Sequence, residues 1–169
     1  MKRCAMHLFR AFDVNFSERC VELFARFLRE KFSLDAFDSI CFRGLSGALI
    51  APKVAHVLGK PLLAVRKGEH CHSNYKVEGH AIGARAILID DLIDSGKTVA
   101  EILKAFKDDS EDKVFGNYKP PTLVAILLYD SFSGREIFKA GSFIHAPKGV
   151  NIPIYSLDRI EGQLATRLL

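Results

Sequence analysis

Two neighbouring carboxylates follow an apolar run near the middle of the chain. Residues 87–98 read ILIDDLIDSGKT, with Asp90 and Asp91 directly after the apolar residues. A short apolar run that ends in turn residues predicts a buried strand, which puts both acids at a strand end. From there they can accept hydrogen bonds from two vicinal hydroxyls or hold a hydrated Mg²⁺ ion.

The residues after the acids have the composition of an anion-binding turn that opens a helix. This turn consists of Asp94, Ser95, Gly96, Lys97 and Thr98. Its backbone N–H groups and the positive end of the following helix favour a bound phosphate. A Walker-type ATP site is excluded, because no glycine stands at the required spacing before Gly96. A phosphate beside a pair of hydroxyls describes a ribose 5-phosphate.

Composition and charge restrict the class of protein. The chain has 169 residues, 49% of them hydrophobic and 26% charged, with a formal net charge of +4. This length predicts a single domain over residues 1–169. No apolar run approaches the ~20 residues that span a membrane. The mild positive charge suits an anionic small molecule, and without a Lys/Arg-rich stripe no nucleic-acid partner is expected. Four cysteines without a C-x-x-C pair, and no signal peptide, predict reduced thiols in the cytoplasm.

Alternating strand and helix patterns surround the central stretch. Residues 5–9 are interpreted as a short edge strand or an arm. Strands are expected at 37–42, 61–65, 84–89, 122–129 and 151–157, with an edge strand at 141–145. Helices are expected at 18–32 (capped by Ser17), 48–58, 99–106, 133–140 and 159–168. This order predicts an α/β fold with three layers, in which helices flank a twisted, mostly parallel sheet with right-handed crossovers.

Basic residues follow two other expected strands. Arg43 and Gly44 begin the sequence RGLSG after the strand at 37–42, and Arg66 and Lys67 follow the strand at 61–65. Ligands of open α/β sheets bind at this edge, so these residues are candidates to contact an anion. An ordinary β–α turn and a solvated basic corner have the same residue types, and both alternatives stay open.

The polar stretch at 68–83 has no regular period, and long irregular loops are often active-site lids. Its candidate lid residues are His70, His72, Ser73 and Tyr75. A zinc site at His70, Cys71 and His72 is not favoured, because adjacent residues of an extended chain point to opposite sides and no second ligand pair has the spacing that metals need.

The stretch at 87–98 resembles the phosphoribosyl pyrophosphate (PRPP) signature of type I phosphoribosyltransferases. The resemblance is good over 37 to about 129 and faint at both ends. It implies a Rossmann-like core at about 37–130, a small hood from 1–16 and 131–169, bound Mg²⁺ and a homodimer. The turn is most like that of the hypoxanthine–guanine members, in which an aspartate at the position of Asp94 faces the purine N7 as a general base. Capping of the next helix is the alternative role for this residue.

The resemblance also implies a role for each candidate residue. The acids Asp90 and Asp91 would bind the ribose hydroxyls and Mg²⁺, and together with Asp94 they would form the catalytic group. The 5-phosphate would lie on Asp94, Ser95, Gly96, Lys97 and Thr98. The pyrophosphate would contact Arg43, Gly44, Arg66 and Lys67, with a cis peptide bond between Phe42 and Arg43. The base would contact Ile152, Tyr155 and Asp158, with Asp158 also near the metal.

The implied function is transfer of the phosphoribosyl group from PRPP to a purine base in nucleotide salvage, with release of pyrophosphate. The base itself stays open among hypoxanthine, guanine, xanthine, adenine and a pyrimidine, because no lysine aligns with the one that contacts the exocyclic oxygen of oxopurines. Two other functions stay open. One is a regulatory member of the fold that senses PRPP or a nucleotide without transferase activity, and the other is a hydrolase or phosphorylase of a ribosyl phosphate.

Overall fold

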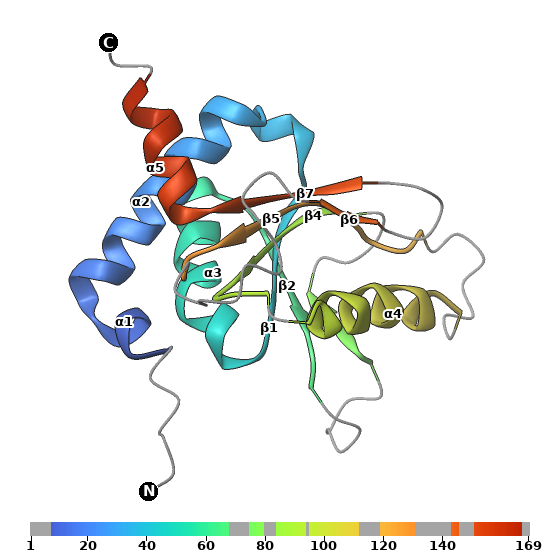
Figure 1. The fold of residues 1–169 in the computed structure, drawn as a ribbon. Coiled ribbons are helices and arrows are strands. Elements are labelled where there is room, and N and C mark those ends of the chain that lie inside the picture. The colour runs from blue at the N-terminus through green and yellow to red at the C-terminus, as the bar shows by residue number, and fades with distance from the viewer. Residues whose placement is uncertain are drawn as a thin grey trace, which may run out of the picture.

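A computed structural model describes residues 8–67, 75–79, 84–93, 95–111, 119–130, 143–145 and 151–166. Within these ranges seven strands form one sheet in the order β3-β2-β1-β4-β5-β7-β6 (Figure 1). The strands are β1 (Ser39–Arg43), β2 (Leu62–Val65), β3 (Val77–Gly79), β4 (Arg85–Asp90), β5 (Thr122–Leu128), β6 (Phe143–His145) and β7 (Asn151–Ser156). The helices are α1 (Phe9–Phe12), α2 (Val14–Lys31), α3 (Gly44–Leu58), α4 (Lys97–Glu111) and α5 (Leu157–Thr166), with a 3-10 turn at Leu34–Ala36.

The sheet is mostly parallel, as the alternation of elements predicts. Strands β2, β1, β4, β5 and β7 pair in parallel, and only the edge strands β3 and β6 pair antiparallel within the described part of the chain. Strand β4 lies between β1 and β5, and five of its six residues are buried. The apolar run before Asp90 is therefore the central strand, because a strand covered on both faces needs apolar residues at every position.

Helices cover both faces of the sheet. Helix α4 lies on one face, and α1, α2, α3 and α5 lie on the other (Figure 1). Ile87 and Ile89 of β4 pack with the α2 and α3 side chains, whereas Ala86 and Leu88 pack with those of α4. This alternation follows from the two-residue period of a strand. The three-layer α/β architecture predicted from the sequence is confirmed.

Helix α2 begins earlier than its apolar pattern suggests. Its first residue is Val14, and Asp13 is the N-cap, with a carboxylate oxygen 2.8 Å from the backbone nitrogen of Phe16. The prediction that Ser17 caps this helix is wrong, because Asp13 satisfies the first turn one turn upstream. Ser17 lies inside the helix, where its buried hydroxyl accepts a 2.7 Å hydrogen bond from Nζ of Lys53.

Other boundaries also differ from the sequence expectations. Phe9 begins the short helix α1, so a strand at 5–9 is wrong for the described residues 8 and 9. Helix α3 begins at Gly44, directly after β1, rather than at residue 48. The stretch at 68–83 contains strand β3, which pairs with β2. The helix expected at 133–140 lies outside the described residues, and the hood stays a prediction because much of the chain ends lies outside them too.

None of the described helices has the length and apolar character that crossing a bilayer requires.

Two buried serines differ in their hydrogen bonding, and this predicts opposite behaviour on truncation. No described residue hydrogen-bonds to Oγ of Ser39, which is fully buried at the start of β1. Because an unpaired buried hydroxyl is destabilising, Ser39→Ala should raise the free energy of unfolding by about 1 kcal/mol in urea denaturation. Ser17→Ala is the control, since it removes a bonded hydroxyl and should give no gain. Loss of stability in Ser39→Ala would contradict this prediction.

Candidate functional site

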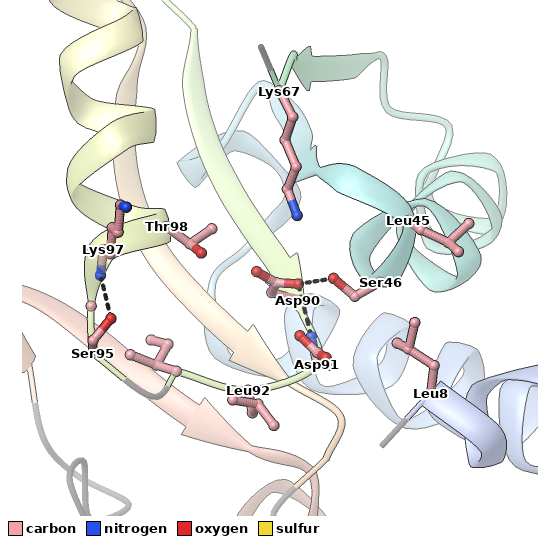
Figure 2. A pocket seen from close by; sticks show the side chains of 12 residues that line it. Leu8, Leu45, Ser46, Lys67, Asp90, Asp91, Leu92, Ser95, Lys97 and Thr98 are labelled. Carbon is pink, nitrogen blue, oxygen red and sulfur yellow. Dashed lines mark hydrogen bonds between the residues drawn. The ribbon is translucent and has the colours of Figure 1, made fainter. Parts of the chain in front are cut away.

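The order of the strands reverses between β1 and β4. From β1 the chain crosses to β2 through α3 on one face, and from β4 it crosses to β5 through α4 on the other. A crevice forms at the carboxyl ends of the strands where such crossovers diverge. A cavity of about 260 Å³ lies there (Figure 2). It is lined by Leu8, Leu45, Ser46, Lys67, Asp90, Asp91, Leu92, Ile93, Ser95, Gly96, Lys97 and Thr98.

The two acids lie at the carboxyl end of β4 with their side chains nearly withdrawn from water. Asp90 is 5% exposed and Asp91 is 8% exposed. Oδ1 of Asp90 accepts a 2.6 Å hydrogen bond from the Ser46 hydroxyl and a 3.0 Å hydrogen bond from the backbone N–H of Asp91 (Figure 2). Burial raises the pKa of Asp90 to about 7; the Ser46 hydrogen bond opposes this rise and the charge of Asp91 adds to it.

The small-residue turn lies at the start of α4 and lines the same cavity. Gly96 has a φ of +72°, a left-handed conformation that favours glycine. Helix α4 begins at Lys97, whose backbone N–H lies 3.4 Å from Oγ of Ser95. The N-terminal end of α4 therefore faces the cavity, with the positive potential that attracts an anion. Asp94 lies outside the described residues.

Lys67 is the basic residue after β2 that lines the cavity. Its ammonium occupies space that exists because residue 44 is glycine: a Cβ on Gly44 would lie 2.5 Å from Nζ of Lys67. Figure 2 shows the Lys67 side chain directed toward Asp90 from the opposite wall. Gly44 also has a φ of +72°, which a residue with a side chain rarely adopts. Gly44 and Lys67, which the sequence analysis predicted separately as contacts for an anion, therefore pack directly against each other.

The structure differs from the sequence expectations for the two arginines. Arg43 forms an ion pair with Glu101 of α4, and Arg66 forms a 2.5 Å ion pair with Glu78 of β3. Neither arginine lines the cavity, because each carboxylate draws its arginine toward a neighbouring element. Nε of Arg43 is buried without a hydrogen-bond partner among the described residues. The peptide bond between Phe42 and Arg43 is trans, so the expected cis bond is absent at this position.

The predicted base-binding residues are not among the residues that line the cavity. Ile152 is buried in the core beneath α4. Tyr155 faces the other side of β7, where its ring centroid lies 4.9 Å from that of Phe27 and 6.0 Å from that of Phe32. Asp158 is an exposed residue in the first turn of α5. The strand period directs the side chains of Ile152 and Tyr155 into the cores on either face of β7, and their contact with a base stays a prediction. Of the predicted lid residues, Tyr75 is exposed, and His70, His72 and Ser73 lie outside the described residues.

Sequence reasoning missed Ser46 and Tyr129. Ser46 was part of the RGLSG sequence, but its partner Asp90 is distant along the chain. Tyr129 follows β5, is 1% exposed, and donates a 3.0 Å hydrogen bond from its hydroxyl to the carbonyl oxygen of Ser46. Burial and the nearby carboxylates raise the pKa of Tyr129 above its ordinary range, so this hydroxyl stays protonated. The available signal for Tyr129 was its position at the end of the apolar run that forms β5.

The donor set at the cavity fits Mg²⁺ that arrives with a phosphorylated ligand. No cluster of three or more His, Cys, Asp or Glu residues within the described ranges is arranged to hold a metal. Magnesium, however, commonly binds through one or two carboxylates together with substrate phosphates and waters. Asp90 and Asp91 supply two adjacent carboxylates on a cavity wall. Asp158, the third predicted ligand, is not among the lining residues.

The raised pKa of Asp90 predicts a pH-dependent gain in stability on its neutralisation. The pKa is 3.8 in an unfolded chain and about 7 here, so the folded chain retains a proton that the unfolded chain has released. The contribution of this group to stability therefore falls as the pH rises through this interval. Asp90→Asn should raise the free energy of unfolding by about 1–3 kcal/mol near pH 8 and change it little near pH 4. The exposed Glu18→Gln is the control, and equal effects of Asp90→Asn at both pH values would contradict the prediction.

Comparison with known proteins identifies the fold. No protein-family model and no curated protein sequence matches this chain. Among solved structures, an adenine phosphoribosyltransferase is 20% identical with a TM-score of 0.59, over 89% of this chain and 83% of that one. The adenine phosphoribosyltransferase of Saccharomyces cerevisiae is 21% identical with a TM-score of 0.57, over 89% and 82%. The orotate phosphoribosyltransferase of Francisella tularensis is 13% identical with a TM-score of 0.54, over 91% and 72%.

These similarities describe the architecture of the chain and do not identify a substrate. The particular likeness of the turn to hypoxanthine–guanine enzymes stays a prediction. The similarity extends over most of the chain in each comparison and includes enzymes named for different bases. This chain therefore has the fold of the type I phosphoribosyltransferases.

Proposed function

We propose that this chain transfers the 5-phosphoribosyl group of PRPP to a purine base and releases pyrophosphate. One observation carries the proposal: the cavity at the switch point combines an anion-binding helix start, two buried carboxylates and the Lys67 ammonium. These groups match the phosphate, the vicinal hydroxyls and the anionic leaving group of a single ligand. Two carboxylates alone would repel that ligand, and a phosphate turn alone would not distinguish it from other phosphate esters.

The donor sugar binds along the wall formed by β4 and α4. Backbone N–H groups of the turn at 95–98 bind the 5-phosphate, and the N-terminal end of α4 adds favourable potential. Asp90 and Asp91 accept hydrogen bonds from the ribose hydroxyls. Their negative charge also stabilises the positive charge that develops on the sugar as its bond to pyrophosphate breaks.

The departing pyrophosphate gains negative charge in the transition state. Lys67 reaches the cavity over Gly44 and is the described cation best positioned to stabilise that charge. Arg43 and Arg66 are paired with Glu101 and Glu78, so their roles in binding pyrophosphate require these pairs to open. Asp90 and Asp91 would hold Mg²⁺, which when bound neutralises part of the charge on the pyrophosphate.

The purine acceptor is supported by the sequence of the turn. Asp94 stands where the hypoxanthine–guanine enzymes have a general base for the purine N7. The Saccharomyces cerevisiae enzyme of similar fold was solved in complex with adenine, which is a purine, and an imino-altritol bisphosphate. The homodimer and the cytoplasmic location implied by the sequence remain part of this proposal.

The direct test is release of pyrophosphate from PRPP and Mg²⁺ in the presence of single bases. Hypoxanthine, guanine, xanthine and adenine are compared with orotate, and release with a purine supports the proposal. A PRPP- or nucleotide-sensing protein is the second candidate, favoured because neither Tyr155 nor Asp158 lines the cavity. Tight binding of PRPP without release on any base would favour this regulatory function, and release without a base would indicate a hydrolase.

Lys67→Ala is expected to lower turnover more than it weakens binding of ribose 5-phosphate. The lysine is assigned to the leaving group, which ribose 5-phosphate lacks. Loss of one charged contact made mainly in the transition state should reduce turnover by roughly 10²–10³. Lys104→Ala, which removes the same charge from the exposed side of α4, is the control. Parallel losses of turnover and ribose 5-phosphate affinity would assign Lys67 to the phosphate instead.

Asp94→Asn separates the three roles open to this residue. If Asp94 is the general base, PRPP affinity by calorimetry should stay nearly unchanged while turnover with the purine falls by roughly 10²–10⁴. If it only caps the next helix, turnover should hardly change, because asparagine caps as well as aspartate. If it faces the phosphate, loss of its charge should tighten PRPP binding. Near wild-type turnover of a purine would exclude the general-base role.

A further inference from the structure

We propose that Ser46 is a positioning residue that holds the Asp90 carboxylate in the orientation that accepts hydrogen bonds from the ribose hydroxyls. This inference rests on the proposed function, and it adds a residue to which no role has been assigned above. Ser46 lies in the first turn of α3 and lines the cavity beside Asp90. Its role is to fix another residue, so it is not itself a catalytic group.

The hydrogen bond from Ser46 is short and is joined by a second at the same oxygen. The Ser46 hydroxyl donates to Oδ1 of Asp90 at 2.6 Å, and the backbone N–H of Asp91 donates to Oδ1 at 3.0 Å. Two donors from different directions restrict rotation of the carboxylate about its last torsion angle. Of these two donors, only the Ser46 hydroxyl belongs to another element, so it links the end of β4 to α3 (Figure 2).

Tyr129 holds Ser46 in turn. The phenol donates to the Ser46 carbonyl oxygen at 3.0 Å, and the backbone N–H of Tyr129 donates to the carbonyl oxygen of Asp90 at 3.2 Å. Tyr129 is 1% exposed, so both bonds are shielded from competing water. The three residues thus join the ends of β4 and β5 to the first turn of α3.

Close packing of the backbone brings Ser46 within reach. A Cβ added to Gly47 would lie 2.8 Å from the carbonyl oxygen of Ile89, the residue before Asp90. Helix α3 therefore meets β4 at a separation that a residue with a side chain at position 47 would not allow without a shift. The adjacent Ser46 is held at hydrogen-bond distance by this contact and not by its side chain alone.

Such a constraint matters because Asp90 lies beside a second carboxylate. The charge of Asp91 acts on Asp90, and a carboxylate that could rotate freely would lose orientational entropy when a ligand binds. A carboxylate fixed in advance avoids that loss. The effect should appear for ligands that carry the ribose hydroxyls and not for ligands that contact only the phosphate turn.

The test compares two probes on the same variants by calorimetry. Inorganic phosphate probes the turn at 95–98, and ribose 5-phosphate probes the turn and the carboxylates together. Ser46→Ala should weaken ribose 5-phosphate binding roughly tenfold, the size expected for losing a hydrogen bond to a charged group, and leave phosphate affinity unchanged. Ser46→Thr retains the hydroxyl and should restore most of the affinity. Tyr129→Phe should give a smaller loss in the same direction, and Ser39→Ala is the control for removal of a buried serine hydroxyl elsewhere in the sheet.

Each outcome has one interpretation. A loss for ribose 5-phosphate alone, recovered in Ser46→Thr, supports the positioning role. Unchanged ribose 5-phosphate affinity in Ser46→Ala overturns it and leaves the proposed function intact. Equal losses for both probes overturn it in favour of a general structural role of Ser46. If the wild-type chain binds ribose 5-phosphate no more tightly than phosphate, the proposed function fails and this inference fails with it, a result visible before any variant is made.

Discussion

The first turn of α3 lies against the last residues of β4, and this contact determines the shape of the cavity. A side chain at Gly47 would meet both the carbonyl oxygen of Ile89 and the Cβ of Phe42 at 2.8 Å, so α3 would have to move away from the sheet. The close approach instead brings Ser46 to Asp90 and leaves Gly44 beneath the Lys67 ammonium. Gly44 and Gly47 thus leave the space in which the side chains of Ser46, Lys67 and Asp90 converge. The donor-side site depends on backbone packing before it depends on any single charge.

The convergence places two adjacent carboxylates where burial is electrostatically unfavourable. Two adjacent carboxylates are buried, and burial raises the pKa of Asp90 against the opposing hydrogen bond from Ser46. A fold that needed only stability would gain by replacing such a pair with apolar residues, because buried charge without full compensation is destabilising. Under the proposed function, ligand hydroxyls and a bound cation would add favourable contacts to this pair. The burial of both acids and the raised pKa of Asp90 are therefore better explained by a ligand-binding role than by a structural role. Perturbed pKa values cluster at functional sites.

The sequence was sufficient where the determining interactions are local. The buried strand before Asp90 and the turn at 95–98 follow from contiguous residue types, and both were predicted. It was insufficient where a distant partner decides the outcome. The ion pair between Arg43 and Glu101, the hydrogen bond of Ser46 and the pairing of the polar strand β3 with β2 all depend on residues far apart in the chain. The cap of α2 was missed for a different reason, since Asp13 and Ser17 are both residue types that cap helices and the helix extends one turn beyond its apolar pattern to Val14.

The same distinction explains why the sugar donor is better defined than the acceptor. The groups assigned to PRPP come from three strand ends at one edge of the sheet, and the most informative of them are consecutive in sequence. The acceptor has no comparable contiguous motif: the residues expected to contact it lie on β7 and α5, where the strand period and helix packing direct them elsewhere. Enzymes of similar fold are named for adenine and for orotate, so the shared sheet does not fix the base. Under the proposed function, selection of the acceptor therefore depends on segments outside the sheet, and of these the cavity already includes Leu8, before α1, and Leu45 of α3.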